Sequence, residues 1–257
     1  IYMTVDSDGN VYVTGTFNIV GLSGYSNLVT LKYDANGFLR FAQSETLYTG
    51  YIRDIAVDSS GNVYVLAGET YWYYTRVIKY DANGGRRWGR IISSPQSDAV
   101  ALEVDSAGNV YVLATTRSSS DYLTLKYDTN GNLLWSQQYN GGGTETAVDL
   151  ALDSAGNVIV TGHSNNDYLT LKYNANGALL WFRRYNGGGT ETAADVTVDS
   201  AGNIIVTGTG DNDYLTLKYD ANGNQLWARR FNVGTDRATA VTVDSAGNVY
   251  VTGESNG

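Results

Sequence analysis

One short turn sequence, Asp-Ser-x-Gly-Asn, recurs six times along the 257 residues of this chain. The copies begin at Asp6, Asp58, Asp105, Asp153, Asp199 and Asp244, so successive copies start 45 to 52 residues apart. A repeat of this length is typical of propeller blades and kelch-like units, which bury their apolar faces only by packing against neighbouring units. The repeat therefore constrains the fold more strongly than it constrains the function.

The pattern within each repeat copy predicts two β-hairpins. In the fourth copy, two short apolar stretches flank the turn at residues 153–157, and two further β-rich stretches flank the turn at 174–177. Gly stands near the end of both turns, where it adopts a positive φ without steric cost. We therefore predict four strands per copy, joined in chain order as an up-and-down meander.

The predicted second strand of each copy is apolar on both faces. Residues 109–114 are Asn-Val-Tyr-Val-Leu-Ala and residues 203–207 are Asn-Ile-Ile-Val-Thr, whereas a strand with one solvated face alternates apolar and polar residues. Such strands must be covered on both sides, as they are when four-stranded sheets stack face to face around an axis. The expected fold class is all-β, a β-propeller of four-stranded antiparallel blades.

Each predicted fourth strand carries a large aromatic residue at the same distance from its turn. These residues are Phe41, Trp88, Trp135, Trp181 and Trp227. We expect them to fill the wide outer gap between neighbouring blades, and the alternative is a ring of ligand platforms. Trp72 lies outside this register and is the Trp that we would first test for contact with a partner.

The residues of these hairpins resemble a known repeat family. Residues 54–65 and 125–135 are similar to the bacterial and archaeal seven-bladed propeller repeat (SBBP-like), which is related in pattern to NHL-type blades. The resemblance implies an exported or surface-attached repeat protein, generally without assigned activity. It also implies that the first strand of each blade lies nearest the axis and the fourth lies outermost.

The last repeat copy is incomplete, with five complete repeats followed by a C-terminal half-blade. We expect a single β-propeller repeat domain over residues 1–257, with six blade positions, that is part of a longer chain or of an assembly. The second strand of the last copy would then be an uncovered edge, which is a template for pairing with another strand. This candidate assembly edge consists of Asn248, Val249, Tyr250, Val251 and Thr252.

Composition and charge narrow the possible partners. The net charge of −9 argues against nucleic acid, which requires a concentrated basic face. No apolar run is long enough to cross a bilayer, so membrane insertion is not expected. Only 17% of the residues are charged, which favours an extracellular or cell-surface location. The partners that we expect are other molecules of the same chain or other surface proteins.

Most of the arginines fall on the predicted fourth strands. Arg86, Arg87, Arg90, Arg183, Arg184, Arg229 and Arg230 form this group. Charge at an outer strand discourages edge-to-edge aggregation, which is one interpretation. The other is a basic rim that docks on the acidic turns of a neighbouring molecule.

No motif in the sequence indicates catalysis, and we expect that the chain is not an enzyme. His163 is the only histidine, and we predict a surface polar role for it. Asp54, Asp149 and Asp195 stand at matching first-strand positions. We expect them to accept hydrogen bonds between blades and not to act as an acid and base pair. No catalytic residue is proposed.

The turns contain oxygen-rich side chains that suit a hard cation. Residues 6–10 and 34–37 superficially resemble calcium loops, but they are too short for an EF-hand. Asp and Asn in such turns usually bond to their own backbone. We therefore expect no metal site and no cofactor, with calcium as the alternative.

Two functional hypotheses follow. The first is a non-enzymatic extracellular or cell-surface scaffold that self-assembles into a filament or array through its incomplete blade. The alternative is a lectin-like propeller that binds a glycan or another small ligand between blades. Its candidate ligand contacts are Tyr122, Tyr168 and Tyr214 with the preceding Asp121, Asp167 and Asp213, for which packing at the strand start is the competing role.

Overall fold

The computed structural model describes residues 1–18, 24–48, 50–69, 74–92 and 96–256. Every element of regular secondary structure in those ranges is a β-strand. None of the described residues forms a helix that could span a membrane. The chain divides into two compact units, residues 1–118 with 123–136, and residues 119–122 with 137–257. The single domain expected over residues 1–257 stays a prediction.

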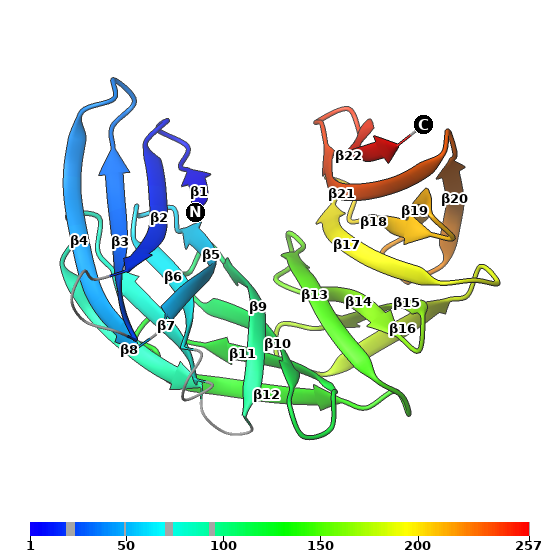
Figure 1. Ribbon diagram of the computed structural model, residues 1–257, viewed down its shortest axis with the longest axis horizontal. Coiled ribbons are helices and arrows are strands. Elements are labelled where there is room, and N and C mark those ends of the chain that lie inside the picture. Colours follow the sequence, from blue (N-terminus) through cyan, green and yellow to red (C-terminus); the bar gives the residue numbers. More distant parts are fainter. Residues whose placement is uncertain (19–23, 49, 70–73, 93–95, 257) are drawn as a thin grey trace. The chain divides into compact units, whose positions relative to one another are not determined.

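Three four-stranded sheets belong wholly or largely to the first unit (Figure 1). The first sheet contains β1 (Tyr2–Val5), β2 (Val11–Asn18), β3 (Tyr25–Tyr33) and β4 (Leu39–Tyr48). The second contains β5 (Gly50–Val57), β6 (Val63–Glu69), β7 (Tyr74–Tyr80) and β8 (Arg86–Ile92). The third contains β9 (Ser97–Val104), β10 (Val110–Thr116), β11 (Tyr122–Tyr127) and β12 (Leu133–Tyr139), with residue 122 and residues 137–139 in the second unit.

The remaining sheets belong to the second unit (Figure 1). The fourth sheet contains β13 (Glu145–Leu152), β14 (Val158–Ser164), β15 (Asp167–Tyr173) and β16 (Leu179–Tyr185). The fifth contains β17 (Glu191–Val198), β18 (Ile204–Gly210), β19 (Asp213–Tyr219) and β20 (Gln225–Phe231). The last has two strands, β21 (Thr235–Val243) and β22 (Val249–Asn256).

In every sheet the strands follow one another in chain order. Each sheet is therefore one repeat copy, and we call it a blade. Five complete blades and a two-stranded sixth occur in the described residues, which confirms the predicted all-β class and the four strands per copy.

Within each unit, the first strand of a blade packs against the preceding blade. In the first unit β5 contacts β1, β2 and β3, and β9 contacts β5, β6 and β7. In the second unit β17 and β21 repeat these contacts on the fourth and fifth blades. Consecutive sheets are thus stacked face to face in a propeller-like arrangement, as the repeat length predicts.

The apolar cores lie between consecutive blades and not within them. One core joins Leu66 and Val77 of the second blade to Val112 and Leu123 of the third. Another joins Tyr168 of the fourth blade to Val206 of the fifth. Because both faces of the middle strands are covered, β6 is buried at every position, which confirms the expectation from their apolar pattern.

Hydrogen bonds from the chain itself fix each Asp-Ser-x-Gly-Asn turn. Asp58 Oδ1 accepts the backbone N–H groups of Ser60 (3.0 Å) and Asn62 (2.9 Å), and Asp58 Oδ2 accepts the Asn62 side-chain amide (2.8 Å). Gly61 has a φ of 74°, which explains the invariant Gly of the repeat copies. The carboxylate thus replaces backbone partners that the turn would otherwise lack.

A β-bulge in the first strand places a carboxylate against the next blade. The register of β5 shifts between Ile52 and Asp54, and Asp54 Oδ2 accepts the backbone N–H of Leu102 in β9 (2.8 Å). Asp149 bonds in the same way to Val196 (3.0 Å), and Asp195 to Val241 (2.7 Å). This confirms that the repeated first-strand carboxylates are acceptors between blades.

Candidate functional site: a cationic groove on the second blade

The outer-strand aromatics seal the gap between one blade and the second hairpin of the next. Trp88 of β8 is 8% exposed, and its Nε1–H donates to the carbonyl oxygen of Thr129 (3.0 Å). Its ring lies so close to the following turn that a Cβ on Gly131 would be 3.0 Å from Trp88 Cδ2. In the second unit Trp181 donates to Ala221 in the same way (3.1 Å). These two tryptophans have the predicted gap-filling role, and Trp72 lies outside the described residues.

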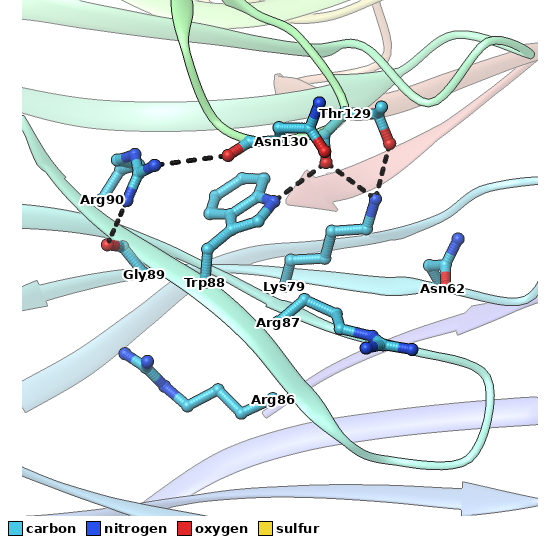
Figure 2. A pocket seen from close by; sticks show the side chains of 9 residues that line it. All are labelled: Asn62, Lys79, Arg86, Arg87, Trp88, Gly89, Arg90, Thr129 and Asn130. Carbon is cyan, nitrogen blue, oxygen red and sulfur yellow. Dashed lines mark hydrogen bonds between the residues drawn. The ribbon is translucent and has the colours of Figure 1, made fainter.

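Two cationic side chains beside Trp88 bond to the same turn (Figure 2). Lys79 Nζ donates to the carbonyl oxygen of Thr129 (3.0 Å) and to its hydroxyl (2.8 Å). Arg90 Nε donates to the carbonyl oxygen of Gly131 (2.7 Å), and Nη2 to that of Asn130 (3.3 Å). All of these acceptors are uncharged oxygens, so the hydrogen bonds position both cations without neutralising their charge.

Together these side chains form one wall of a groove of about 640 Å³ (Figure 2). Its lining residues are Asn62, Lys79, Arg86, Arg87, Trp88, Gly89, Arg90, Thr129 and Asn130. Four of them are cationic and none is acidic. A concave surface of this composition suits an anionic group, because Arg and Lys form charge-assisted hydrogen bonds to carboxylates and phosphates.

The cationic character of this groove departs from the repeat. At the positions of Arg86 and Arg87, the other complete blades have Leu39 and Arg40, Leu133 and Leu134, Leu179 and Leu180, and Gln225 and Leu226. The equivalent groove of the fourth blade, about 700 Å³, has one cationic lining residue, Arg183. The second blade therefore has two cations at a pair of positions where the first blade has one and the third to fifth blades have none.

Part of this charge is balanced nearby. Arg86 forms an ion pair with Glu45 of β4, and Arg87 Nε lies 3.0 Å from Asp81 Oδ2. The Arg87 side chain nevertheless keeps 64% of its exposure, so a ligand has access to it. Burial lowers the pKa of Lys79. Arg87 and Arg90 are thus the cations best placed to meet an incoming anion.

The arginines predicted for the outer rim make two different kinds of contact, and only some of them bond to the turn of the next blade. Arg183 Nε donates to the carbonyl oxygen of Gly223 in the next blade (2.6 Å), as Arg90 does to that of Gly131. Arg184, its neighbour on β16, instead donates to the carbonyl oxygen of Ser164 (2.9 Å), and Arg230 repeats this contact with Gly210 (2.9 Å). Successive residues of a strand point to opposite faces, so a run of two arginines serves two different contacts.

The tyrosines proposed as glycan contacts lie between blades. Tyr122 and Tyr168 are fully buried, and their hydroxyls donate to the carbonyl oxygens of Leu169 (3.3 Å) and Leu215 (3.1 Å). Burial raises the pKa of both side chains. Tyr214 is half-buried and packs on Phe231, with ring centroids 5.9 Å apart. These positions favour the packing role, and glycan binding stays a prediction.

The aspartates that precede these tyrosines are also buried. Asp121 accepts a hydrogen bond from the Ser119 hydroxyl (2.7 Å). Asp167 lies 3.5 Å from Arg184, and Asp213 lies 3.7 Å from Arg230. The three aspartates therefore take part in polar networks between strands.

The candidate assembly edge has the position that the sequence predicts. Within the described residues, β22 hydrogen-bonds only to β21, and it contains Val249, Tyr250, Val251 and Thr252. Asn248 belongs to the turn before it and donates its side-chain amide to Asp244 (2.7 Å). Assembly through this edge stays a prediction.

The turn carboxylates are already occupied by protein donors. Asp6 Oδ1 accepts two backbone N–H groups, and Asp6 Oδ2 accepts the Asn10 amide (2.8 Å) and the Tyr12 hydroxyl (2.8 Å). Among the described residues no group of three or more His, Cys, Asp or Glu side chains is arranged to hold a metal ion. The carboxylate of Asp6 thus bonds to its own turn, and the calcium alternative stays a prediction.

His163 differs from the surface polar residue that the sequence predicts. It is half-buried at the end of β14, its Nδ1 atom is buried without a hydrogen-bond partner among the described residues, and burial lowers its pKa. The sequence signal for a special role of His163 is its departure from the repeat. Three other copies have Thr at this position, namely Thr16, Thr115 and Thr209.

The C-terminal part of the chain, from β20 of the fifth blade to the end of the half-blade, matches a known repeat family. Residues 226–257 match the family of SBBP beta-propeller repeats. This confirms the resemblance drawn from the hairpin sequences. No curated protein matches the chain.

Several solved structures share the β-propeller fold at low sequence identity. Hydrazine synthase from Kuenenia stuttgartiensis is 11% identical with a TM-score of 0.67, over 97% of this chain and 72% of that one. A gluconolactonase-like protein is 14% identical with a TM-score of 0.51, over 93% and 86% of the two chains. A luciferin-regenerating enzyme is 11% identical with a TM-score of 0.52, over 94% and 84%.

These structures correct the expectation that the chain is not an enzyme. That expectation rested on the absence of catalytic motifs, yet the similar propellers include enzymes. A propeller holds functional side chains on strands and loops that are far apart in sequence, so a short motif is a poor indicator. At these identities the comparison establishes the fold and assigns no reaction.

Proposed function

We propose that this chain is an interaction scaffold that binds an acidic partner in the cationic groove of the second blade. The observation that supports this proposal is the pair of cations, Arg86 and Arg87, at outer-strand positions where the third to fifth blades have uncharged residues. The propeller fold supplies a frame for such a surface, because within each unit neighbouring blades are joined by hydrogen bonds and by apolar contacts. Electrostatic complementarity would give the partner its orientation and its association rate.

The partner that we propose first is a second molecule of the same chain. The chain has a net charge of −9, and its second-hairpin turns carry Asp34, Asp81, Asp128 and Asp220. Hydrogen bonds donated within each turn hold the pKa of these carboxyls below the usual range, so they are ionised at neutral pH. An ionised turn of one molecule and the cationic groove of another are complementary in charge.

The test compares the natural chain with Arg86→Leu/Arg87→Leu, which restores the residues of the fourth blade. Light scattering is measured against protein concentration at low and high salt. We expect the natural chain to associate and its association to weaken at high salt, because exposed charges are screened beyond about 10 Å at 0.1 M. The double variant is expected to stay monomeric, and Arg229→Leu on the fifth blade is the matched control.

Equal association of the natural chain and the double variant would contradict the proposed site. A natural chain that stays monomeric, and that also fails to bind a poly-Glu peptide, would contradict the binding function itself. A monomer that binds the peptide through Arg86 and Arg87 would retain the site and replace the partner by another acidic protein.

We further propose that the protein acts outside the cell or on its surface. The low charged fraction of 17% and the resemblance of the repeats to exported proteins support this proposal. Detection of the protein in the culture medium or in a surface-shaved fraction of its source cells would test it, and exclusive recovery from the cytosol would contradict it.

A further inference from the structure

A second exception to the repeat occurs in the second unit. His163 on β14 replaces the Thr of three other copies, and Arg237 on β21 stands where the fourth and fifth blades have Thr146 and Thr192. The side chains of His163 and Arg237 line one groove of about 750 Å³. This volume lies in the range of small-molecule sites, roughly 300 to 1,000 Å³.

The β-bulges of three successive first strands each contribute a residue to the lining of this groove. The bulged residues are Val148 in β13, Ala194 in β17 and Thr239 in β21, and all three line it. Bulges redirect side chains and are enriched beside functional sites. Bonds from Asp149 to Val196 and from Asp195 to Val241 hold neighbouring bulges together, so the groove is preformed.

Arg237 gives the groove its available positive charge. It is exposed and forms no ion pair with the described residues, although Glu254 stands opposite it in the β21–β22 register. The acidic lining residue Asp211 is already engaged. Its Oδ1 accepts the backbone N–H of Thr190 (3.0 Å), and its Oδ2 lies 3.5 Å from Arg230.

The other lining groups are mostly neutral hydrogen-bonding groups. Thr192, Thr209 and Thr239 contribute hydroxyls, and Asn212 contributes an amide. His163 lines the groove with atoms other than Nδ1, because Nδ1 is buried. Hydroxyls and an amide around one guanidinium suit a ligand that combines one negative group with several hydroxyls.

We propose that this groove binds a small polyhydroxylated carboxylate of the uronic acid class. Arg237 pairs with the carboxylate, and Thr192, Thr209 and Asn212 bond to hydroxyl groups. The site is separate from the cationic groove of the second blade, and its ligand is a small molecule and not a protein segment.

The test uses D-glucuronate as the probe and D-glucose as the uncharged comparison. Both are titrated into the 15N-labelled full chain, and amide chemical shifts are followed. We expect D-glucuronate to shift the amides around Thr192 and Arg237 saturably, with at least tenfold weaker binding of D-glucose.

Arg237→Thr is the informative variant, because Thr occupies this position in the fourth and fifth blades and is compatible with the strand. It should weaken D-glucuronate binding at least tenfold while the unfolding midpoint stays within a few degrees. Arg229→Leu, outside the groove, should change nothing. The proposal is overturned if D-glucuronate causes no saturable shift, if D-glucose binds equally well, or if Arg237→Thr binds D-glucuronate as the natural chain does.

Discussion

Lys172 Nζ lies 2.9 Å from Asp153 Oδ2 in the fourth blade, whereas its counterpart in the second blade lies over an aromatic ring. There Lys79 Nζ is 4.9 Å from the ring centroid of Tyr64, and the Tyr64 hydroxyl donates to Asp58 Oδ2 (2.9 Å). The fourth blade has Ile159 in place of this Tyr. The carboxylates of these two turns thus take different partners, a phenol in the second blade and an ammonium group in the fourth.

Lys172→Met should therefore destabilise the protein by about 3 kcal/mol, because it leaves a buried carboxylate without its cation. Both side chains of the pair are less than one-tenth exposed. Urea unfolding followed by Trp fluorescence measures the change. Asp153→Asn/Lys172→Met is the control, and it should be less destabilised than the single variant. Equal stability of Lys172→Met and the natural chain would show that the turn amide of Asn157 alone satisfies Asp153.

Stability should fall as the pH rises through the titration of Asp54. Burial raises the pKa of this carboxyl from 3.8 to about 6. A folded pKa above the unfolded one means that the folded state binds the proton more tightly. Its contribution to stability is complete below about pH 4 and is lost as the pH rises towards 6. The difference between the folded and unfolded pKa values corresponds to roughly 3 kcal/mol.

Asp54→Asn isolates this contribution, since it keeps an acceptor for the Leu102 N–H and removes the titrating group. The free energy of unfolding of both proteins is measured between pH 4 and 7. The natural chain should lose about 2 to 3 kcal/mol more than the variant between pH 4 and 6. Parallel curves for the two proteins would show that Asp54 does not titrate in this range.

Gly223→Ala should be more destabilising than Gly202→Ala, although both residues have nearly the same backbone conformation. Their φ values are 81° and 80°, so the strain of a side chain at positive φ, about 1 kcal/mol, is common to both. A Cβ at Gly223 would be 2.8 Å from Trp181 Cδ2, whereas the nearest atom to one at Gly202 is 3.7 Å away. The extra cost should be about 1 to 3 kcal/mol, the usual range for overpacking. Equal losses in thermal unfolding would mean that the Trp181 ring moves aside freely.

Tyr168→Phe should cost about 1 kcal/mol, because it leaves the buried carbonyl oxygen of Leu215 without its donor. Tyr25→Phe, whose ring is exposed, is the comparison and should be nearly neutral. Chemical denaturation of the two variants measures both values. A neutral Tyr168→Phe that also lost binding on a glycan array would restore the lectin hypothesis for this residue.

The parts of the fold that were predictable are those that each repeat copy specifies locally. Gly61 and its equivalents predict the turns, and the unbroken apolar runs of the second strands predict burial on both faces. The carboxylates that follow the bulges, Asp54, Asp149 and Asp195, were also predictable as acceptors, because they recur by blade. Each of these features can be predicted from the sequence of one repeat copy and of the copy next to it.

The candidate sites were harder to predict because they depend on exceptions. The sequence predicts a basic rim that includes Arg86 and Arg87. It does not predict the groove, because the turn that contains Thr129 comes from the next blade. Tyr122 and Tyr168 were correctly predicted at strand starts. The sequence does not say, however, whether the next blade buries their side chains. For His163, the difference from the Thr of other copies was a better guide than its chemistry.

The side chains of Trp88, Lys79 and Arg90 in the second blade donate hydrogen bonds to backbone oxygens of the third blade. Trp181 and Arg183 in the fourth blade do the same to the fifth blade. A backbone oxygen is offered by any turn of the same shape that keeps its Gly, because a side chain at Gly131 or Gly223 would meet the Trp ring of the preceding blade. The attachment therefore depends little on the other residues of the turn. Repeats that keep this Gly can be duplicated or exchanged within a gene without losing these contacts, while the other turn residues diverge towards new ligands.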